Sequence, residues 1–169
     1  VLSGSSQFVM FRNITESLAG RIGLLELLPL SYQEMPEALR EASIYQGGYP
    51  ELVTQNFMYN TLWYNAYLQT YLEKDVRDLI KITNLIDFRR FISLLAARAT
   101  TTLSLTNLAN DLGVSSHTVK NWLSVLEASY IIFLVQPYYN NLGKRLIKSP
   151  KIYFWDTGLV AHLTKITSK

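Results

Sequence analysis

The sequence of 169 residues predicts a mainly α-helical protein with a small β component. Three observations predict this class. Apolar residues recur at helical spacing through most of the chain, residues 105–122 carry the pattern of two helices joined by a tight turn, and the densest apolar run, residues 131–135, is only long enough for a strand. With 49% hydrophobic and 17% charged residues, the chain has enough apolar side chains for a sizeable core.

The composition excludes several classes of protein. No stretch of 18 apolar residues is present, so we expect no membrane-spanning helix. The chain starts at Val1 without a charged segment followed by an apolar one, so we expect no secretory signal. The absence of cysteine excludes disulfides, a thiol nucleophile and a cysteine-based zinc site, and it suits a reducing cytoplasm.

Charge is divided unevenly along the chain. Residues 1–87 carry 6 Lys and Arg against 10 Asp and Glu, whereas residues 88–169 carry 10 against 3. A basic half beside an acidic half indicates that the second half meets a polyanion.

The first 30 residues predict one half of a parallel βαβ unit. Residues 1–4 suit a strand end, residues 6–19 a helix that Gly20 ends, and residues 22–28 a short buried strand that Pro29 ends. Such a unit lacks its sheet neighbours and does not fold by itself.

The middle of the chain predicts helices on both sides of a break. Ser31 and Glu34 form the pattern of a capping box for a short helix. Gly47-Gly48-Tyr49-Pro50 interrupts the helical pattern, and we place the main boundary near it. Residues 56–82 predict one long helix, whose many aromatic residues we interpret as packing against neighbours.

The second half predicts three helices, two strands and a last helix. Asp87 caps a helix over 88–100, with Phe88, Phe91, Ile92, Leu95 and Ala99 facing inward. Further helices run from Thr106 to Gly113 and over 116–128, the latter capped by Ser115 or Ser116. Strands follow at 130–135 and at either 145–147 or 151–155, with a turn at 140–143. Asp156 caps a last helix near 158–163.

Residues 105–122 (LTNLANDLGVSSHTVKNW) carry the most specific pattern, a helix-turn-helix. Ala109 is small where the two helices cross closely, and Gly113 lies at a turn that requires a left-handed backbone. The apolar positions between the two helices are Leu108, Leu112, Val114, Val119 and Trp122. A helix before this motif and two strands after it would complete a winged helix.

The second helix of this motif supplies the candidate DNA-binding residues. His117, Lys120, Asn121 and Ser124 share one outward stripe that could enter a major groove, where Asn121 could read adenine and Lys120 could contact guanine or a phosphate. Lys144 and Arg145 fall at the tip of the predicted wing, where they would meet phosphates. Winged helices also serve as packing or protein-docking modules, so that interpretation stays open.

Other site chemistries lack their patterns. His117 and His162 have no partner at metal-ligand spacing, so we expect no metal site. A phosphate loop of the form G-x-x-x-x-G-K-[ST] is absent, because Tyr138 stands where its first glycine would be and Arg145 follows Lys144.

Several segments together resemble a prokaryotic family of AAA-type ATPases with a winged helix after the ATPase core and an associated domain of unknown function. They are LSGSSQF, ESLAGR, LPLS, GGYPELV, YLEKDVRDL, the helix-turn-helix and KIYFWDTGL. The resemblance covers essentially the whole chain. It implies a remnant of the ATPase core at 1–46, a helical linker at 47–86 and a winged-helix domain at 87–169.

The resemblance also implies roles for two residues. Ser5, in the sensor region, would help orient the attacking water, and Arg21 would act as an arginine finger on a neighbouring subunit's nucleotide. A structural cap on the preceding helix is the alternative for Arg21. The phosphate-binding loop and the magnesium-binding strand would precede Val1, so ATP and Mg²⁺ belong to an intact parent and this chain alone holds no cofactor.

The expected function is therefore the post-catalytic part of a cytoplasmic ATPase, which could form a homo-oligomer through its core. Its winged helix would bind double-stranded DNA or relay the nucleotide state. The alternatives are a stand-alone winged-helix regulator that binds DNA and an adaptor that binds other proteins.

Overall fold

The structure is a computed structural model, which describes residues 23, 25–72, 85–138 and 148–166. Over these residues the protein is mainly helical, with a two-stranded antiparallel sheet, which confirms the predicted class. The elements in chain order are η1 (Glu37–Leu39), α2 (Arg40–Gln46), α3 (Pro50–Thr54), α4 (Asn60–Ala66), the π-helix η2 (Tyr67–Leu72), α6 (Leu85–Ala97), α7 (Leu105–Leu112), α8 (Ser116–Ala128), β1 (Ile132–Val135), β2 (Lys151–Phe154) and α10 (Thr157–Thr164).

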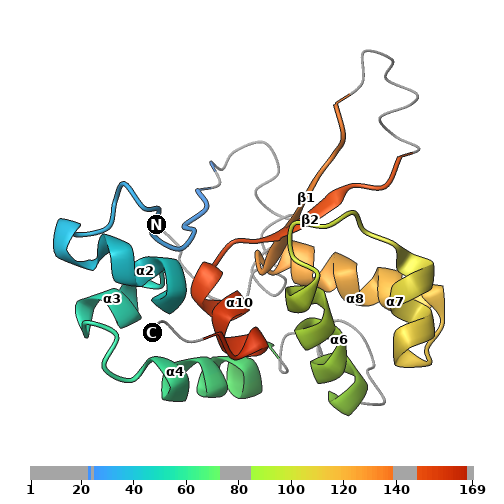
Figure 1. Ribbon diagram of the computed structural model, residues 1–169, viewed down its shortest axis with the longest axis horizontal. Helices are drawn as coiled ribbons and strands as arrows, with labels where there is room; N and C mark the ends of the chain where they lie inside the picture. The colour runs from blue at the N-terminus through green and yellow to red at the C-terminus, as the bar shows by residue number, and fades with distance from the viewer. Residues whose placement is uncertain (1–22, 24, 73–84, 139–147, 167–169) are drawn as a thin grey trace.

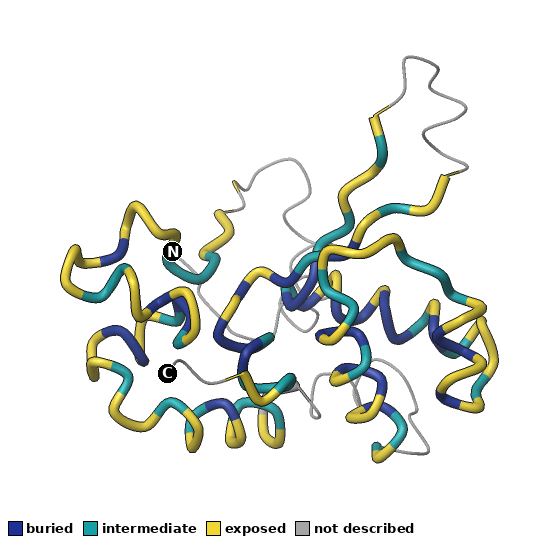
Figure 2. Tube along the Cα trace, in the orientation of Figure 1, coloured by how far each residue is buried: buried dark blue, intermediate teal, exposed yellow. Residues whose placement is uncertain are grey.

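Helix α10 lies between two groups of elements (Figure 1). Helices α2, α3 and α4 lie on one side of it, and α6, α7 and α8 lie on the other, with the β1–β2 hairpin projecting away from the helices. Helix α10 packs against α2, α4 and α6. The dark blue buried positions run through α6, α8, α10 and the base of the hairpin (Figure 2). The last helix therefore joins the two halves of the molecule.

A short extended segment, residues 100–103, lies beside the hairpin and widens the sheet. Strands β1 and β2 pair with Ile132 opposite Phe154 and Val135 opposite Lys151. On the other edge of β2, the Thr100 N–H donates to the Ile152 carbonyl at 2.7 Å and the Leu103 N–H donates to the Pro150 carbonyl at 2.8 Å. The spatial order is therefore residues 100–103, β2 and β1, and the chain order is α6, this segment, α7, α8 and the hairpin.

The predicted strand at 22–28 is wrong for its described residues. Residues 25–28 form no strand, and Leu25 and Leu27 are 95% and 100% exposed. An apolar run becomes a strand only when a sheet edge accepts its hydrogen bonds, and local pattern does not reveal whether one is available. The predicted elements at 1–4 and 6–19 lie outside the described residues.

The capping-box residues form a turn rather than a helix start. The Glu34 carboxylate accepts hydrogen bonds from both the N–H and the hydroxyl of Ser31, at 2.9 and 2.8 Å. These bonds lower the pKa of Glu34, with the backbone bond as the larger cause. Pro36 follows two residues after Glu34, and the regular helix α2 begins only at Arg40.

The predicted long helix at 56–82 starts later than expected. Asn56 and Phe57 have φ of +49° and +59°, a left-handed conformation that breaks a helix, so α4 begins at Asn60. From Tyr67 to Leu72 the turn widens to a π-helix. The remainder of the predicted helix, residues 73–82, lies outside the described residues.

Helix α6 begins two residues before the predicted cap. Asp87 lies inside its first turn instead of capping it, because Leu85 and Ile86 extend the helix toward the N-terminus. The predicted inward positions Phe88, Phe91, Ile92 and Leu95 are buried, while Ala99 lies beyond the helix end and packs partly against the core. Periodicity thus identified the buried face but not the boundary.

Candidate nucleic-acid interface

The helix-turn-helix of α7 and α8 has the local geometry that its sequence predicts. The Ser104 hydroxyl caps α7 by accepting from the Asn107 N–H at 3.3 Å, and Gly113 ends it with φ +69°. The Ser115 hydroxyl caps α8 by accepting from the Thr118 N–H at 3.0 Å, which settles the choice between Ser115 and Ser116. The end of α7 and the start of α8 are therefore both defined by caps, so the two helices meet at a defined turn.

Apolar residues between the helices fix their mutual orientation. Leu108, Ala109 and Leu112 of α7 and Val119 and Trp122 of α8 are buried, as the motif predicts. The Trp122 ring contacts the Phe88 and Phe91 rings of α6, with centroids 5.7 and 5.2 Å apart. Helix α8 is therefore held against α6 along one face, and its opposite face is available to a partner.

The outward face of α8 carries the predicted stripe. His117, Lys120 and Ser124 are exposed, and Asn121 is half-buried. The Asn121 amide nitrogen lies 3.3 Å from His117 Nδ1, so these two side chains form a hydrogen bond. The Ser124 hydroxyl donates to the Lys120 carbonyl at 3.0 Å, which engages it with its own helix. Lys120 is the cation at the centre of this face.

An ion pair connects the ends of α6 and α7. The Arg98 guanidinium bonds the Asp111 carboxylate, and both side chains are partly exposed. Arg98 therefore adds little positive charge to the surface. Lys148 and Lys151 are exposed at the hairpin. The remaining predicted site residues lie outside the described residues: they are Lys144 and Arg145 of the predicted wing, and Ser5 and Arg21 of the predicted ATPase remnant.

A second set of polar groups, which we call the Asp156 cluster, lies buried between α2, α4 and α10. Its members are Asp156, Tyr64, Gly47, Gly48 and Gly158. Asp156 is 2% exposed, and one of its oxygens accepts from the Tyr64 hydroxyl and the Leu159 N–H, both at 2.6 Å. The other oxygen accepts from the Gly48 N–H at 2.7 Å. One carboxylate thereby joins segments 108 residues apart in the chain.

Close contacts explain why glycine occupies three positions in this cluster. A Cβ on Gly158 would lie 2.3 Å from the Tyr64 hydroxyl oxygen and 2.5 Å from the Gly47 nitrogen. A Cβ on Gly48 would lie 2.3 Å from the Leu30 carbonyl oxygen. Gly47 also has φ +91°, which side-chain-bearing residues rarely adopt. At these three positions the backbone therefore passes closer to its neighbours than a residue with a side chain allows.

Burial controls the titration of this cluster. Burial raises the pKa of Asp156 above its ordinary value, against hydrogen bonds from Tyr64, Gly48, Leu159 and Gly158 that lower it. Burial also raises the pKa of Tyr64 well above its usual range, with the Asp156 charge adding to the effect. The Tyr64 hydroxyl therefore keeps its proton and can donate it to Asp156 in a hydrogen bond.

Sequence reasoning identified Asp156 only as a helix cap, which it is, and missed its second role. The signal lies in two segments, GGYP at 47–50 and DTGL at 156–159, for which the sequence alone predicts no chemistry. Three glycines beside an acidic residue and an aromatic residue are typical of a close backbone approach. Only the fold shows that the two segments touch.

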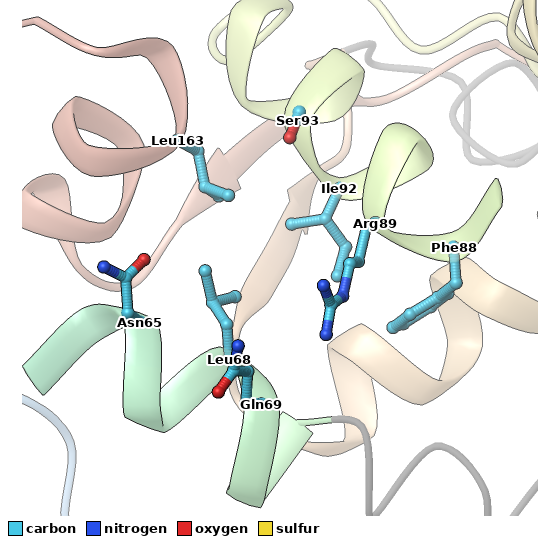
Figure 3. A pocket seen from close by; sticks show the side chains of 8 residues that line it. All are labelled: Asn65, Leu68, Gln69, Phe88, Arg89, Ile92, Ser93 and Leu163. Carbon is cyan, nitrogen blue, oxygen red and sulfur yellow. The ribbon is translucent and has the colours of Figure 1, made fainter. Parts of the chain in front are cut away.

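A cavity of about 210 Å³ lies between η2, α6 and α10 (Figure 3). Leu68, Phe88, Ile92 and Leu163 form its apolar lining, and Arg89, Asn65, Gln69 and Ser93 supply its polar groups. The lining contains no carboxylate and no histidine, so it offers no acid–base pair for catalysis. Nor do the described residues gather three or more acidic, histidine or cysteine side chains in a way that could hold a metal ion. In the described part of the chain, no helix is long and apolar enough to cross a membrane.

Comparison with known proteins places the chain in a family. The sequence profile described as "Domain of unknown function (DUF8612)" matches residues 36–169, and the chain belongs to that family. Uncharacterized proteins of Mycobacterium tuberculosis and Mycobacterium bovis are each 31% identical to it over 156 residues, which cover 92% of the chain. The matched region is 35% of each relative, so the chain spans about a third of their length. No solved structure matches the chain.

Proposed function

We propose that the chain is the post-catalytic part of a larger AAA-type ATPase and that its α6–β2 unit (residues 85–154) is a winged helix that binds double-stranded DNA. The observation that carries the proposal is the outward face of α8, on which Lys120 is exposed. Helix α8 is capped by Ser115 and packed through its opposite face, so this outward face is held in a fixed position. The order of elements, with a three-part sheet after and beside the two helices, supports the same interpretation.

Charge supports a nucleic acid as the partner. Lys120, Lys148 and Lys151 are exposed on this unit, and Lys144 and Arg145 lie in the sequence between the two strands. Phosphate contacts supply most of the affinity of such modules, while base contacts from the inserted helix supply sequence preference. His117 and Asn121, whose side chains lie within hydrogen-bond distance of each other, are the residues that we propose to contact bases.

The test is a titration of the chain against a fluorescent random-sequence duplex by anisotropy at several salt concentrations. We expect affinity to fall linearly with log salt concentration. Lys120→Gln should weaken binding and reduce the salt slope by about 1, because one phosphate contact is lost. The double variant Lys144→Ala/Arg145→Ala should reduce the salt slope more than Lys120→Gln does.

Lys165→Gln is the matched control. It removes the same charge from an exposed lysine at the end of α10, away from the helix-turn-helix. An equal loss of affinity in both lysine variants would mean that only net charge matters. Absence of any duplex binding at low salt would contradict the proposal and direct the search to protein partners.

The ATPase part of the proposal rests on the resemblance of the sequence segments. Each mycobacterial relative is long enough to contain a nucleotide-binding core besides the matched region. The chain itself has no phosphate loop, so its residues do not hold the phosphates of ATP or their Mg²⁺. In the intact protein, Arg21→Ala should leave ATP binding unchanged and reduce hydrolysis. Unchanged turnover would remove the arginine-finger role.

The Asp156 cluster supports a relay between the two parts. Gly47 and Gly48 connect α2 to α3, and Asp156 connects β2 to α10. A shift of the segment before α3 would break a buried hydrogen bond to Asp156 unless β2 and α10 moved with it. We propose that movements of the preceding ATPase core reach the hairpin through this contact.

A further inference from the structure

The β1–β2 hairpin has two chemically different faces. Ile132, Ile152 and Phe154 point toward the helices and are buried. Phe133 and Tyr153, paired across the strands, and Trp155, two residues further on, point to the opposite face. Phe133 and Tyr153 are half-buried and Trp155 is 37% exposed. We call Phe133, Tyr153 and Trp155 the aromatic face.

The three rings form a continuous ladder. The Phe133 and Tyr153 rings are stacked with centroids 5.4 Å apart and planes 19° apart. The Phe133 and Trp155 centroids are 4.5 Å apart with planes inclined by 40°. Neighbouring rings hold one another in place, so the ladder is a pre-ordered row of rings rather than a set of mobile side chains.

Hollows flank the ladder near the strand ends. Trp155 and Tyr32 line one of about 240 Å³. Tyr153 and Ile44 line another of about 270 Å³. Ring-shaped groups stacked on the ladder would therefore have room beside Trp155 and Tyr153.

Positive charge adjoins the aromatic face toward the hairpin tip. Lys151 is exposed on the same face, opposite Val135, and Lys148 is exposed three residues earlier. Aromatic rings beside cations are the combination that binds unpaired nucleotides, because rings stack on bases of any sequence and cations contact the backbone. A blunt duplex has no unpaired bases that could stack on such rings.

We infer that the aromatic face binds unpaired bases, so that the protein prefers duplex DNA with a single-stranded extension over blunt duplex. This inference rests on the proposed DNA-binding function and specifies which form of DNA the protein binds. Helix α8 would contact the paired region, and the hairpin would stack on the first unpaired bases beside it.

The experiment compares three fluorescent DNAs by anisotropy with the complete chain: a blunt duplex, the same duplex with a single-stranded extension, and the same duplex with an extension of abasic sugars. We expect the base-containing extension to bind about fivefold or more tightly than the other two, the lower end of the range for stacking one base. The abasic extension separates stacking from backbone charge.

Two substitutions at one position make the matched pair. Trp155→Leu should abolish the preference for unpaired bases while affinity for blunt duplex stays unchanged, and Trp155→Phe should retain most of the preference. Tryptophan fluorescence gives an independent readout, since quenching by the base-containing extension should be lost in Trp155→Phe. Circular dichroism of each variant verifies the fold.

The outcomes separate the inference from the proposed function. Equal affinity for the three DNAs, unchanged in Trp155→Leu, would overturn the aromatic-face inference and leave duplex binding standing. Equal preference for abasic and base-containing extensions would assign the effect to charge and also overturn it. Absence of binding to every DNA would overturn the proposed function and the inference together, leaving the face to a protein partner.

Discussion

The α6–β2 unit and the Asp156 cluster are held together by different forces. In the unit, the rings of Phe88, Phe91 and Trp122 pack against one another, with centroids 5.2 to 6.1 Å apart. In the cluster region the aromatic residues also act through polar atoms: the Tyr49 hydroxyl donates to the Tyr67 hydroxyl at 3.2 Å, and Trp63 Nε1 donates to Glu51 at 2.9 Å. The α6–β2 unit is therefore held mainly by the packed volume of its apolar side chains, whereas the Asp156 cluster is held by hydrogen bonds between specific partners.

This difference predicts different tolerance to substitution. A core of apolar side chains accepts changes that preserve volume, since no specific partner is lost. A buried polar cluster fails when one atom is removed, since the remaining polar groups lose their partner in a place that water does not reach. Four substitutions test the comparison, from the largest expected effect to the smallest.

Phe91→Ala should cause the largest loss. Phe91 is fully buried between α6 and α8, so its removal leaves a cavity and should cost about 3–5 kcal/mol of the free energy of unfolding. Phe91→Leu should cost less than Phe91→Ala, because it keeps most of the volume. Urea denaturation measures both, with exposed Leu62→Ala as the control. Equal losses in Phe91→Leu and Phe91→Ala would show that ring contacts, not volume, hold this unit.

Tyr64→Phe should destabilise the protein although it preserves volume. Its hydroxyl donates to Asp156, and without it the buried carboxylate loses one partner, a cost of about 1–3 kcal/mol. The control is Tyr59→Phe at an exposed tyrosine, which should change the free energy of unfolding by no more than a few tenths of a kcal/mol. A neutral result for Tyr64→Phe would place the stability of this region in its apolar contacts.

Arg98→Ala tests whether the polar contact within the α6–β2 unit behaves like the buried ones. The Arg98–Asp111 pair is partly exposed, so its loss should cost only about 0.2–1 kcal/mol. Raising the salt concentration should reduce the difference between wild type and variant. A loss comparable to that of Tyr64→Phe would mean that the two regions do not differ in this respect.

His162→Gln tests, by pH, a residue whose ring stacks on the Tyr64 ring of the cluster with centroids 5.3 Å apart. Burial lowers the pKa of His162 below its ordinary 6.5, so the folded state favours the neutral imidazole. The unfolded chain binds the proton first, so stability is complete above 6.5 and falls as the pH falls through the lowered pKa. His162→Gln should lose less stability than wild type over this window. Thermal unfolding from pH 7.5 to pH 5 measures the difference.

Periodic and capping patterns predicted the α6–β2 unit well. The burial of Phe88, Phe91 and Trp122, the left-handed Gly113 and the Ser115 cap are all local consequences of sequence. The stripe of His117, Lys120, Asn121 and Ser124 follows from helix geometry alone, although the His117–Asn121 contact does not. That this stripe binds DNA stays a prediction.

The Asp156 cluster was not predictable in the same way. Its contacts join residues 47–48, 64 and 156, and sequence spacing contains no information on such distant pairs. The predicted strand at 22–28 failed for a related reason, because pairing depends on a sheet edge elsewhere. The helix at 56–82 started late because Asn56 and Phe57 adopt a left-handed backbone that their residue types do not demand. The domain boundary near Gly47 stays a prediction.

The Asp156 contacts determine where the gene can be cut for recombinant work. A fragment that begins at Asp87 would carry the Asp156 carboxylate without Gly48 and Tyr64, two of its hydrogen-bond donors. A fragment that begins at Leu30 would retain both, together with the Leu30 N–H that donates to the Gly48 carbonyl at 2.7 Å. Expression trials of the helix-turn-helix should therefore start upstream of Ser31, and the shorter fragment should be the more rapidly digested by trypsin.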